Sequence, residues 1–300
     1  MERKTTVLKR LLHAPKLLVV PGVYDALSAK IAEQAGFQGA IMGGYSVSAS
    51  VLGEPDVGYL TMNEMLYSLK RICDATTIPI FADGDTGYGN AMNVRRVVRE
   101  AEQAGASAIF FEDQEWPKRC GHMEGKRVIP LEEHVMKIKA AIEARTDPDF
   151  IIMARTDARS VNGLDDALRR AKAYSEAGAD ALFIEAPQSA AEMKLIAQVL
   201  DKPLMANMVE KGKTPLLSAD ELEQMGYALV VYPVSAVYAV AKTLSELFRQ
   251  LKQEGTTQNC LGRMIPFAEF NTIIGLPEYN ETQKRYAHSS CKQLGAKERL

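Results

Sequence analysis

The chain has 300 residues, of which 47% are hydrophobic and 25% are charged, a composition that excludes an intrinsically disordered chain, collagen and a coiled coil. Its 36 basic and 38 acidic residues leave a formal charge of -2, so it lacks the positive excess typical of proteins that bind nucleic acid or an anionic membrane surface. We therefore expect a small-molecule partner, no nucleic acid and no membrane.

The sequence predicts a repeat of strands and helices. Residues 1–12 are basic but have no uninterrupted apolar core and no small-residue cleavage site, so we predict a short amphipathic helix there. Apolar, often β-branched runs then alternate with helical patterns, several of which close on Gly directly before a strand, as in AEQAGASAIFF. The predicted strands are residues 17–20, 39–43, 78–82, 108–111, 150–154, 181–184, 203–206 and 229–232.

Eight βα units favour a closed barrel. Runs that are apolar at successive positions indicate strands buried on both faces, as in a parallel sheet covered by helices. A doubly wound sheet is the alternative, but residues 21–25 after the first strand contain no GxGxxG fingerprint. We predict an α/β fold, a (β/α)8 TIM-type barrel that forms one domain over residues 1–300.

Two segments need separate interpretation. The longest uncharged run, residues 224–241, is interrupted by Gly226 and Pro233, which favours a buried strand turning into a helix over a membrane span. Residues 256–300 fall outside the repeat, and we predict that they form a C-terminal helical extension. Its apolar stretch at residues 265–277 needs a partner surface, such as a neighbouring subunit.

Acidic side chains follow the predicted strands at their C-terminal ends, where TIM barrels carry their chemistry. Asp83 and Asp85 follow the third strand two positions apart, so on a continuing strand they would face the same side. Glu112 and Glu185 follow the fourth and sixth strands, and Asp56 lies after the second. Such crowded carboxylates would repel unless a cation neutralised them, so we expect Mg²⁺, with Mn²⁺ as an alternative. Loop caps or ion pairs with Lys and Arg are the other interpretation.

The segment WPKRCGH places the Cys120 thiol beside Lys118, Arg119 and His122. These neighbours favour the thiolate and make the cysteine usable as a proton donor or acceptor. Gly121 indicates a mobile loop, although a lone cysteine is otherwise most often structural. Four scattered cysteines without a CxxC pair indicate a reducing compartment, and we expect a cytoplasmic location. The remaining cysteines are predicted to be structural: Cys73, Cys260 and Cys291.

Further polar residues at strand ends suit a carboxylate substrate. The forked guanidinium of Arg155 fits a carboxylate, with an ion pair to a nearby acid as the alternative. The Asn207 amide fits a substrate oxygen, with an Asx turn as the alternative. The strands contain no lysine for a Schiff base, and the last two strands lack a Gly-rich phosphate cradle. These residues predict a metal-dependent enzyme that acts on a carboxylate and uses a cysteine to move a proton.

Over nearly its whole length the chain resembles the isocitrate lyase and phosphoenolpyruvate mutase superfamily. The segments that carry the resemblance are PGVYDALSA, GYSVSASVLGEPDVG, ADGDTGYGN, FFEDQEWPKRCGHMEGK, MARTDA, EAP and ANMVEKGKTP. The resemblance implies a βα barrel whose C-terminal helix is swapped between subunits of a homotetramer, a dimer of dimers. The family's mutases lack the loop that carries Cys120, which we call the cysteine loop (the segment that begins with WPKRCGH). The resemblance therefore also implies a carbon-carbon lyase.

The resemblance assigns roles to individual residues. Asp83 and Asp85 would hold Mg²⁺, partly through water, with Asp56 close by. Cys120 would be the acid/base, and Arg155 and Glu112 would complete the catalytic set. The implied substrate-binding positions, among which Tyr45 departs from the family's usual small residue, are Gly43, Gly44, Tyr45, Lys118, Gly121, His122, Glu185, Asn207 and Pro233.

Three positions bear on the substrate. Tyr238 and Phe267 stand where the family's 2-methylisocitrate lyases carry two arginines, so a dicarboxylate fits better than a tricarboxylate. Pro233 stands where oxaloacetate hydrolases carry a serine. The remaining activity is cleavage of 2,3-dimethylmalate to pyruvate and propionate, with Trp116, Tyr45 and Phe267 facing the methyl groups. Methylisocitrate cleavage, oxaloacetate hydrolysis and a non-catalytic metal-binding barrel remain alternatives.

The expected mechanism starts from a 2-hydroxy carboxylate chelated by the metal ion. A base near the metal, Glu112, Glu185 or Tyr45, would take the hydroxyl proton, and the bond between carbons 2 and 3 would break. The metal would stabilise the developing alkoxide as a Lewis acid. Cys120 would then protonate the enediolate that leaves, under a loop that closes over the site.

Overall fold

The computed structural model describes residues 2–295 of the chain, and the side chains of residues 2–287. These residues divide into two compact units, Met1–Val240 and Ala241–Leu300. The first unit is built on eight strands: β1 (Leu18–Val23), β2 (Ala40–Met42), β3 (Ile80–Asp83), β4 (Ala108–Glu112), β5 (Ile151–Thr156), β6 (Ala181–Ile184), β7 (Met205–Asn207) and β8 (Leu229–Tyr232).

All the strand pairings are parallel, and the order around the sheet is β6-β5-β4-β3-β2-β1-β8-β7. The two ends of this order meet, because the Leu182 amide of β6 donates to the Pro203 carbonyl at 3.0 Å and Leu182 bridges Leu204 just before β7. The sheet therefore closes on itself, and the predicted TIM-type (β/α)8 barrel is confirmed.

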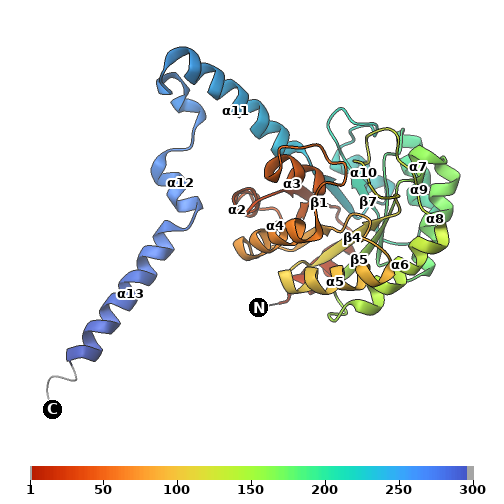
Figure 1. Cartoon of the computed structure of the whole chain (residues 1–300), viewed down its shortest axis with the longest axis horizontal. Helices are drawn as coiled ribbons and strands as arrows, with labels where there is room; N and C mark the ends of the chain where they lie inside the picture. The colour runs from red at the N-terminus through yellow and green to blue at the C-terminus, as the bar shows by residue number, and fades with distance from the viewer. Residues whose placement is uncertain (1, 296–300) are drawn as a thin grey trace. The chain divides into compact units, whose positions relative to one another are not determined.

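Helices cover the outside of the barrel (Figure 1). They are α2 (Ala26–Gln34), α3 (Gly44–Val51), α4 (Met62–Ala75), α5 (Ala91–Ala104), α6 (Leu131–Ala144), α7 (Ala158–Val161), α8 (Leu164–Glu176), α9 (Ala190–Val199) and α10 (Ala219–Met225). In contrast, α1 (Lys4–Leu12) packs against the barrel interior, and α11 (Ser235–Glu254), which follows β8, has no buried residue. Helices α5 and α10 end at Gly105 and Gly226, whose φ angles of 98° and 99° are left-handed, which is why the sequence places Gly between helix and strand there.

Two apolar cores follow from the alternation of side chains along the strands. One lies between the sheet and the helices, and the other fills the barrel interior. Leu8 and Leu12 of α1 belong to the interior core, so the predicted N-terminal helix is present and packs against that core. The interior side chains Phe110, Phe183 and Val231 also line a pocket at the C-terminal ends of the strands. The barrel is thus filled with side chains, and the pocket lies above this filling, at the end where TIM barrels carry their chemistry.

The sequence-based strand positions agree closely with the structure. Strands β6 and β8 begin and end as predicted, whereas β1 and β5 continue two or more residues beyond their apolar runs. Residues 224–241 do form a strand followed by a helix, as predicted. Among residues 2–295, no helix combines the length and apolar character needed to cross a membrane.

The second unit is helical. It contains the rest of α11, a 3-10 helix at Gln258–Arg263, α12 (Phe267–Ile273) and α13 (Leu276–Gly295). Several of its apolar side chains are exposed in the single chain, with Phe267 exposed by 85%. The single domain over residues 1–300 and the exchange of residues 256–300 between subunits both stay predictions.

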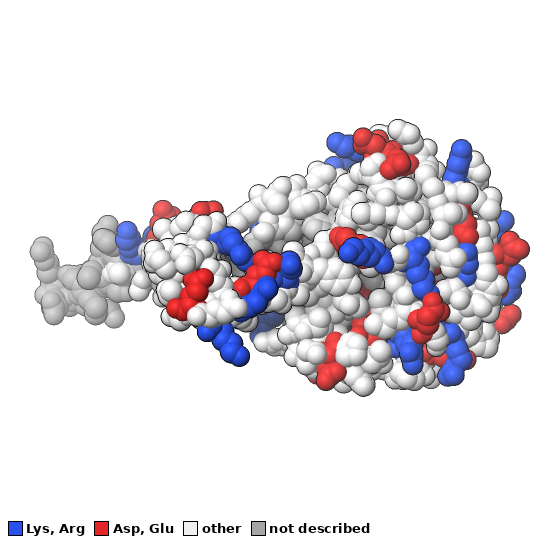
Figure 2. Space-filling view, turned by 90° about the horizontal axis from the view of Figure 1, so that it is seen from above, with Lys and Arg blue, Asp and Glu red and all other residues white. Residues whose placement is uncertain are grey.

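Charged side chains of both signs are interspersed on the face shown in Figure 2. This mixture agrees with the nearly balanced composition of the chain. The face shown therefore gives no indication of an electrostatic surface for a polyanion.

Candidate active site

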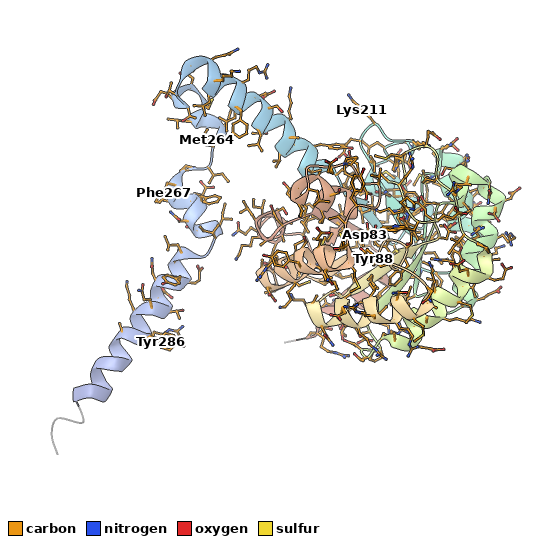
Figure 3. The ribbon with its side chains drawn as sticks, in the orientation of Figure 1. Asp83, Tyr88, Lys211, Met264, Phe267 and Tyr286 are labelled. Carbon is orange, nitrogen blue, oxygen red and sulfur yellow. The ribbon has the colours of Figure 1, made fainter. Side chains whose placement is uncertain are left out.

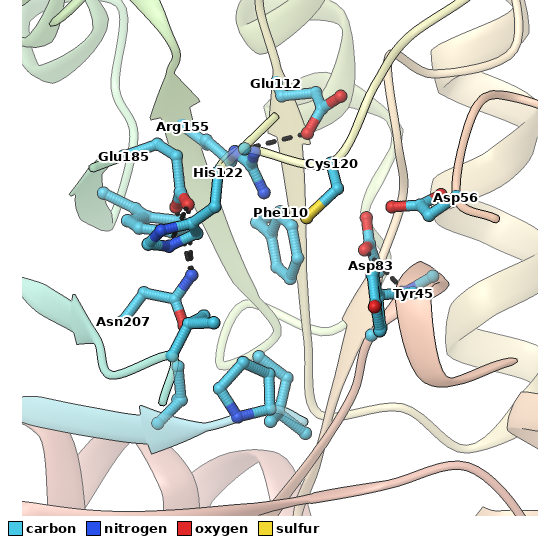
Figure 4. Close-up of a pocket in the computed structure, with 18 of the residues that line it drawn as sticks. Tyr45, Asp56, Asp83, Phe110, Glu112, Cys120, His122, Arg155, Glu185 and Asn207 are labelled. Carbon is cyan, nitrogen blue, oxygen red and sulfur yellow. Dashed lines mark hydrogen bonds and ion pairs between the residues drawn. The ribbon is translucent and has the colours of Figure 1, made fainter. Parts of the chain in front are cut away.

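The pocket lies at the C-terminal ends of the strands and under the loop that follows β4 (Figure 4). It is lined by Ile41, Gly43, Gly44, Tyr45, Asp56, Asp83, Phe110, Glu112, Lys118, Arg119, Cys120, Gly121, His122, Arg155, Phe183, Glu185, Met205, Asn207, Val209, Val231, Pro233 and Val234. The structure therefore brings together all the candidate catalytic and substrate-binding residues. Of the candidate metal ligands, Asp56 and Asp83 line the pocket, and Asp85 lies directly behind Asp83.

Asp83 and Asp85 are neighbours for a different reason from the one predicted. Asp83 ends β3 and lies inside the barrel unit (Figure 3), but Asp85 has a left-handed φ of 48° and belongs to a turn. The two side chains are therefore not neighbours through strand alternation, and the prediction was wrong on this point. The turn joins the two residues instead, because the Asp85 amide donates to Asp83 Oδ1 at 2.9 Å. Gly84 is required between them, since a Cβ there would lie 2.6 Å from the Phe111 ring and 2.8 Å from the Phe110 carbonyl oxygen.

The acidic cluster is buried and crowded. Burial, with the charge of Asp85, raises the pKa of Asp83 to about 6, and burial also raises the pKa of Asp56. Lys118 Nζ lies 2.6 Å from Asp56 Oδ1 and 2.6 Å from Asp85 Oδ1. The ion pairs that the sequence left as an alternative are thus present, and a lysine of the cysteine loop supplies the cation.

The donors in this cluster fit a hard divalent ion. Within the described chain, no three His, Cys, Asp or Glu side chains converge to form a complete site. Mg²⁺, however, usually takes one or two carboxylates together with water and substrate oxygens. Asp85 Oδ2 accepts from the Tyr88 hydroxyl at 2.8 Å, and its Oδ1 is paired with Lys118 Nζ at 2.6 Å. Among the described residues, Lys118 is the one cation in direct contact with this cluster of three carboxylates, so the cluster keeps a negative charge that a divalent ion would neutralise.

Arg155 forms the opposite side of the pocket. Its Nε lies 3.2 Å from Glu112 Oε2, and its guanidinium carbon lies 5.1 Å from the centre of the Phe183 ring (Figure 4). Burial raises the pKa of Glu112 well above its ordinary value, although the charge of Arg155 opposes this. Glu112 Oε1 is buried and has no hydrogen-bond partner among the described residues. Glu112 is thus a carboxyl group that can exchange a proton inside the pocket.

Glu185 is held by two polar neighbours. The Asn207 amide donates to both of its oxygens at 3.2 Å, and His122 Nε2 lies 3.0 Å from Oε1. The Lys213 amide donates to His122 Nδ1 at 2.9 Å, which makes Nδ1 the acceptor and leaves the ring proton on Nε2, facing Glu185. Burial alone would raise the pKa of Glu185, but the charge of Arg155 and the contact with His122 lower it. Glu185 is therefore an ionised, weakly basic carboxylate.

Cys120 points into the pocket between these two sides (Figure 4). The predicted thiolate is wrong, because burial raises the pKa of the thiol to about 11, and the charges of Asp56 and Glu185 add to this effect. The cations beside it in the sequence do not counter the burial, since Lys118 is paired with two aspartates and Arg119 is exposed. The thiol is neutral and suited to donating a proton.

The cysteine loop is fixed at several points. The Gln114 side-chain nitrogen donates to the Arg119 carbonyl at 2.8 Å, and the Arg119 amide donates to Gln114 Oε1 at 3.0 Å. The Cys120 amide donates to the Asp56 carbonyl at 3.1 Å. Gly121 packs directly on Glu185, so that a Cβ there would lie 2.3 Å from Oε1. Only glycine allows the loop to lie this close to the pocket.

The apolar wall differs from the one predicted. Tyr45 lines the pocket, and its hydroxyl lies 3.4 Å from that of Tyr238. Trp116 was placed wrongly, because its ring is half-exposed and packs beside Tyr88, with centroids 6.3 Å apart. Phe267 belongs to the second unit. The wall is formed instead by residues of the strand ends: Ile41, Phe110, Phe183, Met205, Val209, Val231, Pro233 and Val234.

A buried charge network next to the pocket was not predicted from the sequence. Asp157 binds Arg155 Nε at 2.9 Å and Lys126 Nζ at 2.7 Å, and its own amide donates to Asp113 Oδ1 at 2.9 Å. Arg170 and Tyr174 also bond Asp113, at 3.2 and 2.8 Å. The available signal was an acid two positions after Arg155 in MARTDA. The corresponding signal for Lys126 was a lysine shortly after the cysteine in CGHMEGK.

The fold and the pocket define a (β/α)8-barrel protein with a protonatable cysteine above a cluster of carboxylates. Residues 8–252 match the phosphoenolpyruvate phosphomutase family. The chain therefore belongs to the phosphoenolpyruvate mutase and isocitrate lyase superfamily, as its sequence motifs predicted.

Similar proteins carry several names. The chain is 48% identical to the 2,3-dimethylmalate lyase of Eubacterium barkeri, covering 93% of this chain and 97% of the relative. It is 46% identical to the petal death protein of Dianthus caryophyllus, over 97% of this chain and 91% of that one. It is 41% identical to the 2-methylisocitrate lyase of Aeropyrum pernix, over 97% and 93% of the two chains.

Solved structures of the same fold align over almost the whole chain. A crystal structure of 2,3-dimethylmalate lyase superposes with a TM-score of 0.90 at 34% identity, covering 95% of this chain and 96% of that one. Oxaloacetate acetylhydrolase in complex with 3,3-difluorooxalacetate gives 0.90 at 31% identity, over 95% and 97%. Phosphonopyruvate hydrolase in complex with oxalate and Mg²⁺ gives 0.87 at 32% identity, over 95% and 100%.

Proposed function

We propose that the protein is a Mg²⁺-dependent carbon-carbon lyase that cleaves 2,3-dimethylmalate to pyruvate and propionate. The observation that carries the proposal is the neutral Cys120 thiol, which points into a pocket between carboxylates on one side and an apolar wall on the other. The high identity to a relative named 2,3-dimethylmalate lyase supports the same substrate.

The pocket suits a dicarboxylate with methyl substituents. Arg155 offers a guanidinium and Asn207 an amide to carboxylate oxygens. Phe110, Val231 and Pro233 offer apolar surface to the methyl groups. Tyr238 contacts Tyr45 edge to face, with centroids 6.1 Å apart, so this side of the pocket presents phenol rings where a third carboxylate would need a cation.

Asp83, Asp85 and Asp56 are the residues that would hold the divalent ion. When bound, the ion supplies Lewis-acid stabilisation of negative charge on the substrate oxygens. Lys118 contributes a second positive charge in the same place, through its contacts with Asp56 and Asp85. The protein thereby gathers cations beside the oxygen from which a proton must leave.

Among the candidate bases, Glu112 fits best. Its Oε1 has no hydrogen-bond partner among the described residues, and its raised pKa makes the ionised carboxylate a stronger base than Glu185, whose pKa is lowered and whose oxygens are engaged by Asn207 and His122. Glu112 takes the proton of the C2 hydroxyl, a carbonyl forms at C2, and the C2–C3 electron pair passes into the enediolate of propionate. Cys120 then donates its proton to C3. Return of the proton from Glu112 to Cys120, directly or through water, restores both groups.

The test is a pyruvate-release assay with Mg²⁺ and a thiol reductant on 2,3-dimethylmalate, 2-methylisocitrate and oxaloacetate at equal concentration, with oxalate measured in parallel. We expect pyruvate from dimethylmalate alone. Preference for methylisocitrate, or oxalate release from oxaloacetate, would replace the proposal with one of those activities. No turnover of any substrate would favour a non-catalytic metal-binding barrel.

A cysteine variant tests the chemistry. Cys120→Ser should nearly abolish pyruvate release while retaining binding of Mg²⁺. Cys73→Ser, on helix α4 and buried away from the pocket, is the matched control and should keep full turnover. Full activity of Cys120→Ser would remove this residue from the mechanism.

We also propose that the protein works as a cytoplasmic homotetramer, a dimer of dimers in which residues 256–300 are exchanged between subunits. The exposed apolar side chains of the second unit support an association of this kind, since a single chain leaves Phe267 almost uncovered. Light scattering on the eluted protein checks it: the tetramer mass is expected, and a monomer would refute it.

A further inference from the structure

Lys126 lies at the end of the cysteine loop and is almost completely buried, with 1% of its side chain exposed. Its ammonium group donates to two acceptors, the carbonyl oxygen of Gly121 and Asp157 Oδ1, the latter at 2.7 Å. Gly121 directly follows Cys120. The lysine therefore holds the backbone beside the reactive thiol to a residue of the barrel.

The acceptor on the barrel side is part of the pocket's support. Asp157 is fully buried, and it also binds Arg155 through Nε at 2.9 Å and Nη2 at 3.1 Å. Its amide donates to Asp113 Oδ1 at 2.9 Å, which fixes the aspartate backbone. One carboxylate thus sets the positions of both the loop lysine and the arginine that faces the substrate.

Two further charged contacts of the loop involve groups with roles in the pocket. Lys118 binds Asp56 and Asp85, which would hold the metal ion, and His122 contacts Glu185. Lys118 and His122 also line the pocket, so a bound ligand would meet them directly. Neither Lys126 nor Asp157 is among the described residues that line it, so a ligand would reach their contact only through Arg155 or Gly121.

We infer that Lys126 is a positioning residue: it ties the Gly121 carbonyl to Asp157 and so places the Cys120 thiol in a set geometry relative to Arg155. A buried charge is stable only while its partners are in place. The Lys126 ammonium group must therefore stay within hydrogen-bond distance of both Asp157 and the Gly121 carbonyl oxygen. The inference rests on the proposed function, because it needs Cys120 to reach a substrate held by Arg155. Beyond that function, Lys126 connects the cysteine loop to the barrel through a buried contact.

The experiment compares three variants. Lys126→Met removes both hydrogen bonds at similar side-chain length, and Lys126→Arg keeps the charge and the donors. The matched control is Arg127→Met, which removes the neighbouring basic side chain and its exposed pair with Glu115. For each protein we would measure kcat and KM for pyruvate release, and the rate at which iodoacetamide alkylates Cys120, followed by peptide mass spectrometry.

The expected result separates positioning from stability. Lys126→Met should lower kcat by about 100-fold, the size of effect that a displacement of about 1 Å produces, while KM changes by less than about threefold. Alkylation of Cys120 should become about tenfold faster or more, because the loop is no longer tied down. Lys126→Arg should recover most of both properties, and Arg127→Met should match the wild type.

Unchanged kcat with unchanged alkylation in Lys126→Met would overturn the inference, as would equal losses in Lys126→Met and Arg127→Met. If Lys126→Met does not fold by circular dichroism, Lys126→Gln replaces it, and unchanged alkylation there would equally overturn the inference. If the wild type turns over none of the three substrates, the proposed function fails, but the alkylation rates still decide whether Lys126 holds the loop.

Discussion

His134 should make the stability of the fold depend on pH. The ring is fully buried on α6 and packs edge to face on Tyr174, with centroids 4.7 Å apart. Burial, reinforced by the positive charges of Lys137 and Arg170, lowers its pKa from 6.5 to about 3. The folded protein therefore keeps the ring neutral at pH values where the unfolded chain binds a proton. This stability is complete above about pH 6.5 and is lost as the pH falls toward about 3.

The size of the effect follows from the two pKa values. At about 1.4 kcal/mol for each pKa unit, the full loss on acidification is about 5 kcal/mol. Between pH 7 and pH 5 the folded ring stays neutral while the unfolded ring becomes protonated, which costs about 2 kcal/mol. The variant His134→Leu removes the titrating group. Any change in packing alters its stability equally at both pH values, so it cancels in the comparison.

The assay is urea unfolding at pH 7 and pH 5, followed by circular dichroism at one protein concentration. The wild type should lose about 2 kcal/mol more than His134→Leu between the two pH values. His13→Gln removes the exposed histidine that follows the last residue of α1 and should behave like the wild type. An equal pH dependence in the wild type and His134→Leu would refute the idea that burial keeps this ring neutral.

Three further predictions concern the pocket. Mg²⁺ should raise the melting temperature at pH 7.5, as measured by scanning fluorimetry. Its apparent affinity should be about tenfold lower at pH 5, because protons compete for Asp83, whose pKa is raised to about 6. Asp83→Asn should abolish the increase in melting temperature. Gly84→Ala would bring a Cβ within 2.6 Å of the Phe111 ring, so it should displace the turn and lower pyruvate release about 100-fold. The control Gly39→Ala, whose Cβ would lie at ordinary contact distances of 3.5 and 3.8 Å from Pro79 and Val20, should leave the assay unchanged. Pro233→Ser places a hydroxyl in the pocket lining, so it should yield measurable oxalate from oxaloacetate, and an ion chromatogram without oxalate would contradict this.

The strands were predictable because their signal is local. A parallel strand buried on both faces must be apolar at consecutive positions, and this pattern is visible without knowledge of its neighbours. The strand ends were less predictable where pairing continues past the apolar run. In β5, Arg155 pairs with Glu112 of β4 and Thr156 with Ile184 of β6, so the strand extends into polar residues.

The candidate residues were largely predictable, but their charge states were not. Position at a strand end identified Asp83, Glu112 and Arg155, because the fold brings such ends together. The ionisation of Cys120 was predicted from its sequence neighbours, yet it is decided by groups that surround the thiol in the folded structure. Burial dominates, and the adjacent Lys118 is paired with aspartates from other loops. The predicted role of Trp116 failed for a similar reason, since its ring turns outward against Tyr88.

The sequence by itself determined the (β/α)8 architecture, the family and the group of residues at the mouth of the barrel, because these follow from apolar periodicity and from motifs that are contiguous in the chain. Only the tertiary structure decided which charges meet. Lys126, Asp157 and Arg155 form one buried network although 31 residues separate Lys126 from Asp157. The free energy of a buried charge depends on partners within a few ångströms. Which residues come this close is decided by how the barrel folds, not by their separation along the chain.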